Sequence, residues 1–526
     1  MSEQLALLPG YLLAHLELSL LALGTGALVS IPLGILVSRR PAAEGSVLGV
    51  AAVAQTIPSL ALLALMVPLL AALGGWLGPA LGLEVRSIGF LPAWLALSIY
   101  SVLPMLRNTV TGIAGVDPAL VEAARGLGMT PRQQLLRVEL PLALPVIVAG
   151  VRTSTVWVVG TATLATPVGA TSLGNFIFSG LQTRNFGAVV VGSVSAAALA
   201  LVLDGLVALV ERGLAQRRRG LWGGAAGALA ALYIGVALGA LVGGAPTRPV
   251  AVGAKTFTEQ YVLAAILAGT LEEAGAGEVE RVESLGSTVA FDALRSDELD
   301  LYVDYSGTIW ATILGGSGLP GDRESVLAEV RERLADEYGI GVVAALGFEN
   351  TYAIAMREDR AASLGIETIS DLARHAPRLA IGGDYEFFAR AEWRALEERY
   401  GLRFQEERSM DPALMYTAVD QREVDAISAF STDGRIAALG LRLLRDDLGV
   451  IPPYDAIVLA SPRFVADAPA LVDAVRALAG SIDAASMQRM NGAVDEGGET
   501  PDSVAARFLS GRDRAVDEGG EAERRH

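Results

Sequence analysis

The residue types that most often carry chemistry are missing from this 526-residue chain or scattered along it. It contains no cysteine, and its three histidines (His15, His375 and His526) lie far apart in the sequence. Thiol catalysis and cysteine-ligated metals are therefore excluded, and a histidine-based metal site is disfavoured. No combination of nucleophile and base stands out either. The sequence predicts no catalytic residues, no bound metal and no cofactor.

One basic residue is unusual because it is a lysine in a chain whose other basic side chains are almost all arginine. Lys255 is the only lysine beside 40 arginines, and it ends an apolar run just before a predicted helix. A compact point charge at a helix start suits coordination of an anion, with codon chance as the alternative. Gln260 lies one turn into this helix, and the pattern leaves open whether it faces a cleft or solvent. Glu259, Asp304 and Asp433 are interpreted as structural caps or solvated carboxylates rather than acid–base catalysts.

The elements that must position these residues fall into two unlike halves. Residues 1–245 hold 13 arginines against 9 acids, whereas residues 246–526 hold 28 basic against 49 acidic groups. Over the whole chain 52% of residues are hydrophobic and only 19% are charged, below the roughly 25% of soluble proteins. The first half is predicted to be a membrane domain. The second is predicted to be an acidic soluble domain, large enough for two lobes and unsuited to nucleic acid.

Six apolar stretches in the first half are long enough to cross a membrane as helices. They cover residues 11–37, 46–74, 88–106, 141–165, 188–210 and 221–243. Ten arginines lie in the connections after the first, third and fifth stretches, and only Arg86 and Arg184 lie in the other two. The positive-inside rule then places the N-terminus outside and the soluble half on the extracytoplasmic side of the cell (inner) membrane. The alternative for 221–243 is a linker helix lying on the membrane surface.

The connection between the third and fourth stretches contains two short predicted helices. Asp117 can cap the first, which Gly126 and Gly128 end, and Thr130 can cap the second with Gln133 completing a capping box. A plain surface hairpin between spans is the alternative interpretation.

Within this connection, Glu122-Ala123-Ala124, Gly128 and Leu140-Pro141 resemble the EAA loop of ABC importer permeases. In that family a short helix of the loop docks on a cytoplasmic ATPase, so the resemblance implies that Glu122, Ala123, Ala124 and Gly128 are docking residues. The sequence has no Gly-x-x-x-x-Gly-Lys-Ser/Thr motif, and we therefore expect the ATPase to be a separate subunit. We also expect the permease to form a homodimer in the lipid, because a core of five helices is too small to enclose a pathway.

The second half alternates short apolar runs with helical stretches. The strand-like runs cover 250–253, 299–303, 340–345, 352–356, 379–382, 424–427 and 455–460. This alternation predicts parallel sheets covered on both faces by helices. The similar runs Tyr352–Met356 and Asp455–Ala460 bracket a middle block, as expected of a two-lobed domain with a double hinge.

Residues 250–510 resemble the substrate-binding proteins of importers for glycine betaine, choline and related quaternary amines. The motifs that carry the resemblance are Gly253–Gln260, Leu285–Thr288, Asp300–Thr308, Ser431–Arg435 and Pro452–Asp455. Some members of this family, among them ergothioneine importers, join permease and binding domain in one chain. The resemblance implies an α-helical permease of the type I ABC importer kind, followed by an α/β two-lobed domain like the periplasmic binding proteins.

The expected domain organisation follows from these observations. The permease would occupy 1–215 with its docking loop at 115–141, and 216–247 would hold the sixth span and a linker. The binding domain would occupy 248–510, with lobe 1 at 248–350 and 456–510 and lobe 2 at 351–455. Residues 511–526 are predicted to be a disordered tail, which repeats as Ala515–Glu521 the sequence of Ala493–Glu499.

In this family aromatic rings surround the ligand's quaternary ammonium group. The matching positions are Tyr305, Tyr352, Phe430 and Tyr454, and each cation–π contact is worth about 0.5–2 kcal/mol. Many relatives have tyrosine at the position of Phe430, so this chain keeps the π face but loses a hydroxyl. The matching positions for a ligand carboxylate are Lys255, Thr308 and Arg390, with Gln260 as a further candidate contact. The rival interpretation is a ligand-gated receptor or channel, in which a clamshell domain gates a pore without ATP.

Overall fold

The protein is described from a computed structural model covering residues 2–81, 85–183, 185–242, 249–316, 323–384 and 387–511. The chain divides into two compact units, Met1–Phe178 with Gly187–Arg248, and Pro249–His526 with Ser179–Phe186. Residues 243–248 of the linker region lie outside the described residues. Of the tail predicted to be disordered, 511–526, residue 511 ends a helix and the rest lies outside the described residues.

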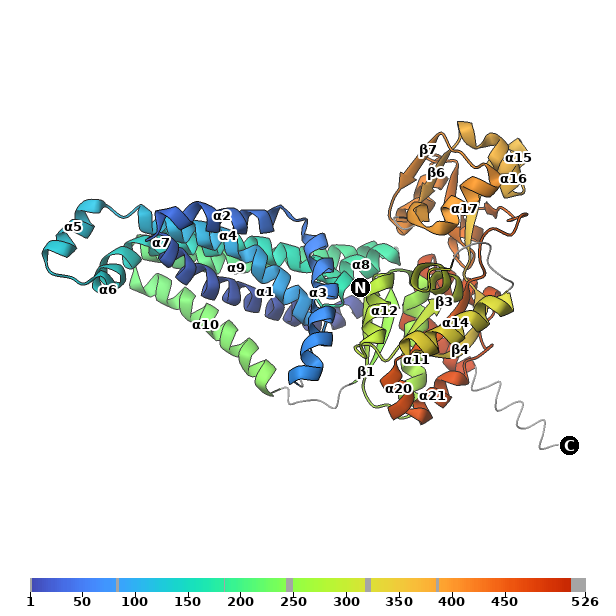
Figure 1. Ribbon diagram of the computed structural model, residues 1–526, viewed down its shortest axis with the longest axis horizontal. Coiled ribbons are helices and arrows are strands. Elements are labelled where there is room, and N and C mark those ends of the chain that lie inside the picture. Colours follow the sequence, from blue (N-terminus) through green and yellow to red (C-terminus); the bar gives the residue numbers. More distant parts are fainter. Residues whose placement is uncertain are drawn as a thin grey trace. The chain divides into compact units, whose positions relative to one another are not determined.

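The first unit is helical (Figure 1). Its elements are α1 (Ser2–Val37), α2 (Pro41–Thr56), α3 (Ser59–Leu81), α4 (Phe90–Ala114), α5 (Pro118–Gly126), α6 (Pro131–Gln134), η1 (Leu135–Glu139), α7 (Leu140–Ala162), η2 (Thr163–Val168), α8 (Gly174–Gln182), α9 (Phe186–Ala215) and α10 (Arg219–Val242). Helix α4 packs against both α1 and α7. Small residues allow the close approach, since a Cβ added at Gly150 of α7 would lie 2.7 Å from Cβ of Asn108 in α4.

Four described helices are long and apolar enough to cross a membrane. They are Leu7–Val37, Phe90–Ala114, Pro131–Val168 and Phe186–Ala215, and a fifth crossing is available if the bent pair α2–α3 forms one span. The sixth predicted stretch forms helix α10 but is not among these helices. Its crossing of the membrane therefore stays a prediction.

The second predicted stretch, 46–74, is not one continuous helix. Helix α2 ends at Thr56 and α3 begins at Ser59, and the two are bent by 97°. Pro58 disfavours helical backbone at the residue before it, and Ile57 is extended, with φ −69° and ψ 126°. The second predicted stretch is therefore two helices that meet at Pro58, and not one continuous helix.

The second unit contains two five-stranded sheets. The first has the order β2-β1-β3-β10-β4 and the second the order β7-β6-β8-β5-β9. The strands of the first sheet are β1 (Val250–Lys255), β2 (Val279–Leu285), β3 (Leu301–Tyr305), β4 (Gly341–Glu349) and β10 (Asp455–Ala460). Those of the second are β5 (Tyr352–Arg357), β6 (Ala380–Gly383), β7 (Glu406–Ser409), β8 (Ala426–Phe430) and β9 (Leu441–Leu443). The chain passes from the first sheet to the second between β4 and β5, and returns just before β10.

The prediction that both sheets are parallel was wrong. Strand β1 pairs in parallel with β2 and β3, and β6 pairs in parallel with β7 and β8. The strands that enter from a crossing run the other way, because β10 is antiparallel to β3 and β4 while β5 is antiparallel to β8 and β9. Strands β5 and β10 begin at the crossings between the two sheets, whereas β8 and β3 end there. A strand that begins at a crossing runs antiparallel to a neighbour that ends at it.

Helices connect these strands (Figure 1). They are α11 (Thr258–Glu273), α12 (Ser287–Arg295), α13 (Ser306–Thr308), η3 (Ile309–Ile313), α14 (Arg323–Tyr338), α15 (Glu358–Leu364), α16 (Ile369–His375), η4 (Ala376–Arg378), η5 (Phe387–Ala389), α17 (Ala391–Tyr400), α18 (Pro412–Asp420), α19 (Arg435–Ala438), α20 (Pro462–Asp467), α21 (Pro469–Arg476), α22 (Ala484–Asp495) and a last helix at 501–511. Helix α11 is buried along most of its length, and it packs against β1, β2 and β3.

Candidate ligand-binding site and docking loop

The strand directions bring the four predicted aromatic residues to the hinge. Strand β3 ends at Tyr305 and β8 ends at Phe430, whereas β5 begins at Tyr352 and Tyr454 directly precedes β10. Tyr352 pairs with Phe430 across β5 and β8, and Ala456 of β10 pairs with Tyr305. Both sheets therefore present these side chains at the edges where the chain crosses between them.

Three of the four rings lie close together, with Tyr352 between Phe430 and Tyr454. The ring centroid of Tyr352 lies 5.0 Å from that of Phe430 at an interplanar angle of 45°, and 5.8 Å from that of Tyr454 at 74°. Tyr305 joins this group through Phe257, whose ring lies 6.2 Å from Tyr305 and 5.8 Å from Phe430. Rings inclined to one another in this way offer several faces to one region, which a cation requires.

Sequence reasoning missed two members of this aromatic group. Phe257 lies inside the Gly253–Gln260 motif, so its place in the motif was an available signal. Phe387 lies on the short helix η5, and its ring centroid is 5.4 Å from that of Tyr352. No local pattern marks Phe387, because only the packing of lobe 2 brings it to β5.

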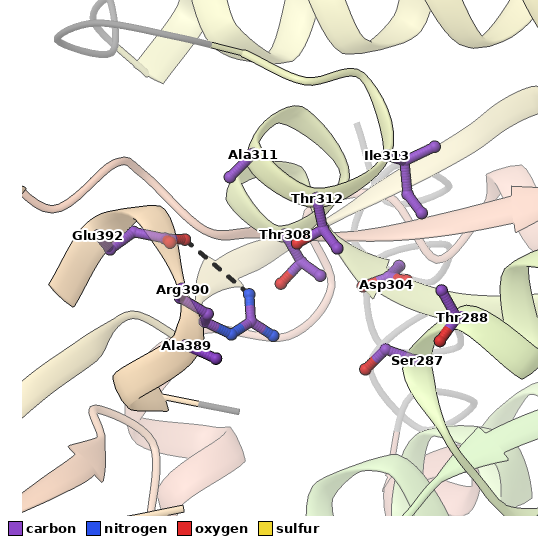
Figure 2. A pocket seen from close by; sticks show the side chains of 10 residues that line it. All are labelled: Ser287, Thr288, Asp304, Thr308, Ala311, Thr312, Ile313, Ala389, Arg390 and Glu392. Atoms are coloured by element: carbon purple, nitrogen blue, oxygen red, sulfur yellow. Dashed lines mark ion pairs between the residues drawn. The ribbon is translucent and has the colours of Figure 1, made fainter. Parts of the chain in front are cut away.

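A cavity of about 450 Å³ is lined by residues of both lobes, and none of the four predicted aromatic residues is among them. Its lining residues are Ser287, Thr288, Asp304, Thr308, Ala311, Thr312, Ile313, Ala389, Arg390 and Glu392. Figure 2 shows Arg390 and Glu392 on one side, and Thr308, Asp304 and Thr288 on the other. The size suits a small molecule, and polar groups from both lobes converge on it.

Arg390 links this cavity to the rings. Its guanidinium carbon lies 5.1 Å from the ring centroid of Tyr352, and its Nη1 lies 3.9 Å from Oε1 of Glu392. Glu392 in turn accepts a hydrogen bond from the hydroxyl of Tyr454. Two of the predicted carboxylate contacts, Arg390 and Thr308, thus face the same cavity.

Lys255 has a protein carboxylate as its partner. Its Nζ lies 2.6 Å from Oδ1 of Asp304 and 5.0 Å from the ring centroid of Tyr305. Asp304 also accepts from the hydroxyl of Tyr302 at 2.8 Å. The lysine is therefore paired with a carboxylate of the protein itself, and its predicted contact with a ligand carboxylate stays a prediction. Of the two alternatives given for Asp304, a structural group or a solvated carboxylate, the solvated one is excluded because its side chain is buried.

Gln260 faces the aromatic residues and not solvent. It is buried, its Nε2 donates to the hydroxyl of Tyr305 at 3.1 Å, and its Oε1 accepts from the backbone N–H of Lys255 at 3.3 Å. Of the two alternatives left open by the sequence, the solvent-facing one is excluded.

The remaining singled-out carboxylates are buried structural groups. Asp433 accepts from the backbone N–H and from Nε of Arg435, both at 2.9 Å. Glu259 accepts four hydrogen bonds, and burial raises its pKa above the ordinary value. Asp495, which sequence reasoning did not single out, accepts from Oγ1 of Thr258 at 2.6 Å, and burial raises its pKa to about 7. None of them is solvated.

The predicted caps of the docking loop are all present. The Asp117 side chain accepts from the N–H of Ala119 at 2.9 Å, and Thr130 and Gln133 form a capping box. Helix α5 ends at Gly126, and Gly128 has φ +78°, a conformation that glycine adopts freely. Figure 1 shows α5 and α6 projecting beyond the ends of the other helices of the first unit.

The surface of α5 presents the residues that the motif singled out. Glu122 and Ala123 are exposed, whereas Ala124 is buried against the rest of the loop. Leu120 is 47% exposed and Leu127 79% exposed. Large apolar side chains exposed beside a charged one are typical of a protein-binding surface.

Among the described residues no group of three or more histidine, aspartate or glutamate side chains could hold a metal ion.

A helical membrane unit with such a loop, followed by a two-sheet unit with a polar cavity at its hinge, defines an ABC importer permease joined to its substrate-binding domain. Two families match the chain accordingly. The "Binding-protein-dependent transport system inner membrane component" matches residues 30–216, and the "Substrate binding domain of ABC-type glycine betaine transport system" matches residues 248–511.

The chain belongs to this family of ABC importers. It is 30% identical over 468 residues to "Ergothioneine transport permease/ergothioneine binding protein EgtU" of Helicobacter pylori, covering 86% of this chain and 81% of that protein. It is 44% identical over 200 residues to "Choline transport system permease protein OpuBB" of Bacillus subtilis, covering 38% and 85%. A solved glycine betaine/carnitine/choline ABC transporter structure has 30% identity and a TM-score of 0.44, covering 50% of this chain and 97% of that one. The permease is embedded in the membrane, and the C-terminal domain is extracytoplasmic.

Proposed function

We propose that this chain is the membrane permease and tethered receptor of an ATP-driven importer for small quaternary ammonium compounds. The ligand's cation is held by Tyr305, Tyr352, Phe430 and Tyr454. A carboxylate, where the ligand has one, is bound by Arg390 and Thr308. Lys255 and Gln260 support the Tyr305 ring from the protein side.

The observation that carries this proposal is the geometry at the hinge. Three inclined aromatic rings are in contact with one another, and Arg390, which lines a cavity of about 450 Å³, lies 5.1 Å from the ring centroid of Tyr352. A permanent cation cannot donate a hydrogen bond, so π faces are its best protein partners, while a guanidinium fork suits a carboxylate. Glycine betaine, carnitine and ergothioneine combine both groups, and choline has the cation alone. Relatives of this chain are named as transport proteins for ergothioneine, choline and carnitine, which all belong to this set.

The structure modifies the role proposed for Lys255. Its side chain is 5% exposed, and its ammonium group is paired with Asp304. We propose that Lys255 acts by holding Asp304 and the Tyr305 ring in place, and that direct contact with a ligand carboxylate falls to Arg390.

A separate ATPase is the proposed source of energy, and Glu122, Ala123, Ala124 and Gly128 are its proposed docking residues. Two exposed leucines, Leu120 of α5 and Leu127 directly after it, would give that contact an apolar centre. The permease is proposed to work as a homodimer, because the described spanning helices are too few to enclose a pathway.

The test is a binding and transport experiment on the full-length chain. Thermal shift in lipid nanodiscs with glycine betaine, proline betaine, carnitine, choline and ergothioneine should identify at least one stabilising ligand. Uptake of that ligand into proteoliposomes should then require ATP and the ATPase subunit. No stabilisation by any of the five would overturn the ligand class. Ligand-driven ion conductance without the ATPase would favour the rival ligand-gated channel.

A further inference from the structure

Glu259 is a buried carboxylate in contact with the hydroxyl group of Tyr305. Its Oε1 accepts from the hydroxyl of Tyr305 at 2.6 Å and from Nδ2 of Asn350 at 2.9 Å. Its Oε2 accepts from Nδ2 of Asn491 at 3.1 Å and from the hydroxyl of Thr432. Both oxygens are thus filled by donors, the arrangement that an ionised carboxylate requires. All four donors are neutral.

The lack of a cationic partner distinguishes Glu259 from three other buried carboxylates near the hinge. Asp304 has Lys255 at 2.6 Å, Asp433 has Arg435 at 2.5 Å, and Glu392 has Arg390 at 3.9 Å.

Within the part of the chain that the structure describes, no lysine, arginine or histidine forms an ion pair with Glu259. The beginning of α11 offers partial positive charge from the helix dipole. A buried carboxylate without a full counter-charge is costly, so a cation arriving close by is strongly favoured.

We propose that Glu259 is the counter-charge for the ligand's quaternary ammonium group, acting through Tyr305, and that it makes the site select a cation over a neutral group of the same shape. This inference rests on the proposed function, because it takes Tyr305 as one wall of the cation site. The phenol that donates to Glu259 carries a more electron-rich ring than a free phenol, since hydrogen bonds polarise their partners. The carboxylate also attracts the cation directly, across a medium that screens charge far less than water does.

Without a ligand the net shift of the Glu259 pKa is upward, and its hydrogen bonds and a bound cation oppose that shift. Burial raises the pKa of the Tyr305 hydroxyl well above its ordinary value, and the nearby Glu259 carboxylate raises it further, so the phenol stays protonated and donates. Burial also raises the pKa of Glu259, whereas each of its four hydrogen bonds lowers it. A bound cation would favour the ionised form further.

Matched pairs of charged and neutral ligands test the proposal. Choline and 3,3-dimethylbutan-1-ol have the same shape, as do glycine betaine and 3,3-dimethylbutanoate, and each pair differs in the charge on one atom. Titration of the full-length chain in nanodiscs should give tighter binding of the charged member. Glu259→Gln should lower that preference about tenfold or more, by weakening the cation and not the neutral compound. Tyr305→Phe, which keeps the ring and removes the hydroxyl contact, should lower it by a smaller factor.

The control is Glu398→Gln, which removes one exposed charge from α17 of the same domain and should leave the preference unchanged. Thermal unfolding checks that each variant is folded. If Glu259→Gln does not fold, Tyr305→Phe alone decides the matter. A merely structural role for Glu259 would weaken both members of a pair equally, and this result, or an unchanged ratio, would overturn the inference. A wild-type chain that binds neither choline nor glycine betaine would overturn the inference, whereas the proposed function is overturned only if none of the five compounds binds.

Discussion

Replacing Tyr352 should separate the contribution of its π face from that of its hydroxyl. The ring is 7% exposed, lies 5.0 Å from Phe430 and 5.8 Å from Tyr454, and has the Arg390 guanidinium 5.1 Å from its centroid. In the proposed complex the ligand's cation contacts this aromatic group. Tyr352→Phe keeps the ring and should change the affinity little, whereas Tyr352→Ala removes the ring.

The expected loss in Tyr352→Ala has two parts. The cation–π contact contributes about 0.5–2 kcal/mol. A third of the area that a buried tyrosine covers, about 60 Å², would no longer contact the ligand, at a cost of about 1.5 kcal/mol. Together they predict binding weaker by about 30-fold to 400-fold.

Isothermal titration of the full-length chain in nanodiscs, with the ligand found by thermal shift, is the assay. Truncating a buried ring also destabilises the fold, by about 3–5 kcal/mol. Phe464→Ala is the matched control, because Phe464 is a ring buried to a similar extent in α20, outside the aromatic group and the cavity lining. Near wild-type affinity in Tyr352→Ala, or an equal loss in Phe464→Ala, would refute the role of this ring.

Three further predictions concern other parts of the chain. Glu122→Arg should abolish ATP-driven uptake at unchanged ligand affinity, and normal uptake at normal membrane levels would exclude Glu122 from docking. Arg390→Ala should weaken glycine betaine by about 2–5 kcal/mol in titrations and leave choline nearly unaffected, so equal losses would remove the division of roles. Since burial raises the pKa of Asp495 from 3.8 to about 7, the folded chain holds a proton that the unfolded chain releases. This stabilisation is complete below about pH 4 and is lost as the pH rises through about 7. Asp495→Asn should flatten the corresponding fall in melting temperature, and an unchanged pH profile would contradict the assignment.

The sequence predicted the features that depend on neighbouring residues. The caps at Asp117 and Thr130 appear as expected, because a cap joins a side chain to a backbone N–H only two or three residues away. The division into a membrane half and an acidic half was equally clear, because each solvent imposes its own composition over hundreds of residues. The bend at Pro58 was also within reach, since proline restricts the residue directly before it.

Features that depend on direction and pairing needed the tertiary structure. Alternating strands and helices suggested parallel sheets, yet β5 and β10 run antiparallel to their neighbours because each enters its sheet from a hinge crossing. The same reversal places Tyr352 opposite Phe430. The sequence indicated that these residues matter through the family resemblance, but not that their rings touch.

The electrostatic partners of the site were beyond sequence reasoning for the same reason. Lys255 and Asp304 are 49 residues apart, Tyr454 and Glu392 are 62 apart, and Asn491 reaches Glu259 across 232 residues. The sequence by itself determined the class of transporter and the residue types of the site. Which carboxylates are buried, and which of them has a cation beside it, was decided by the tertiary structure, because burial and charge pairing arise only where distant strand ends and helices meet.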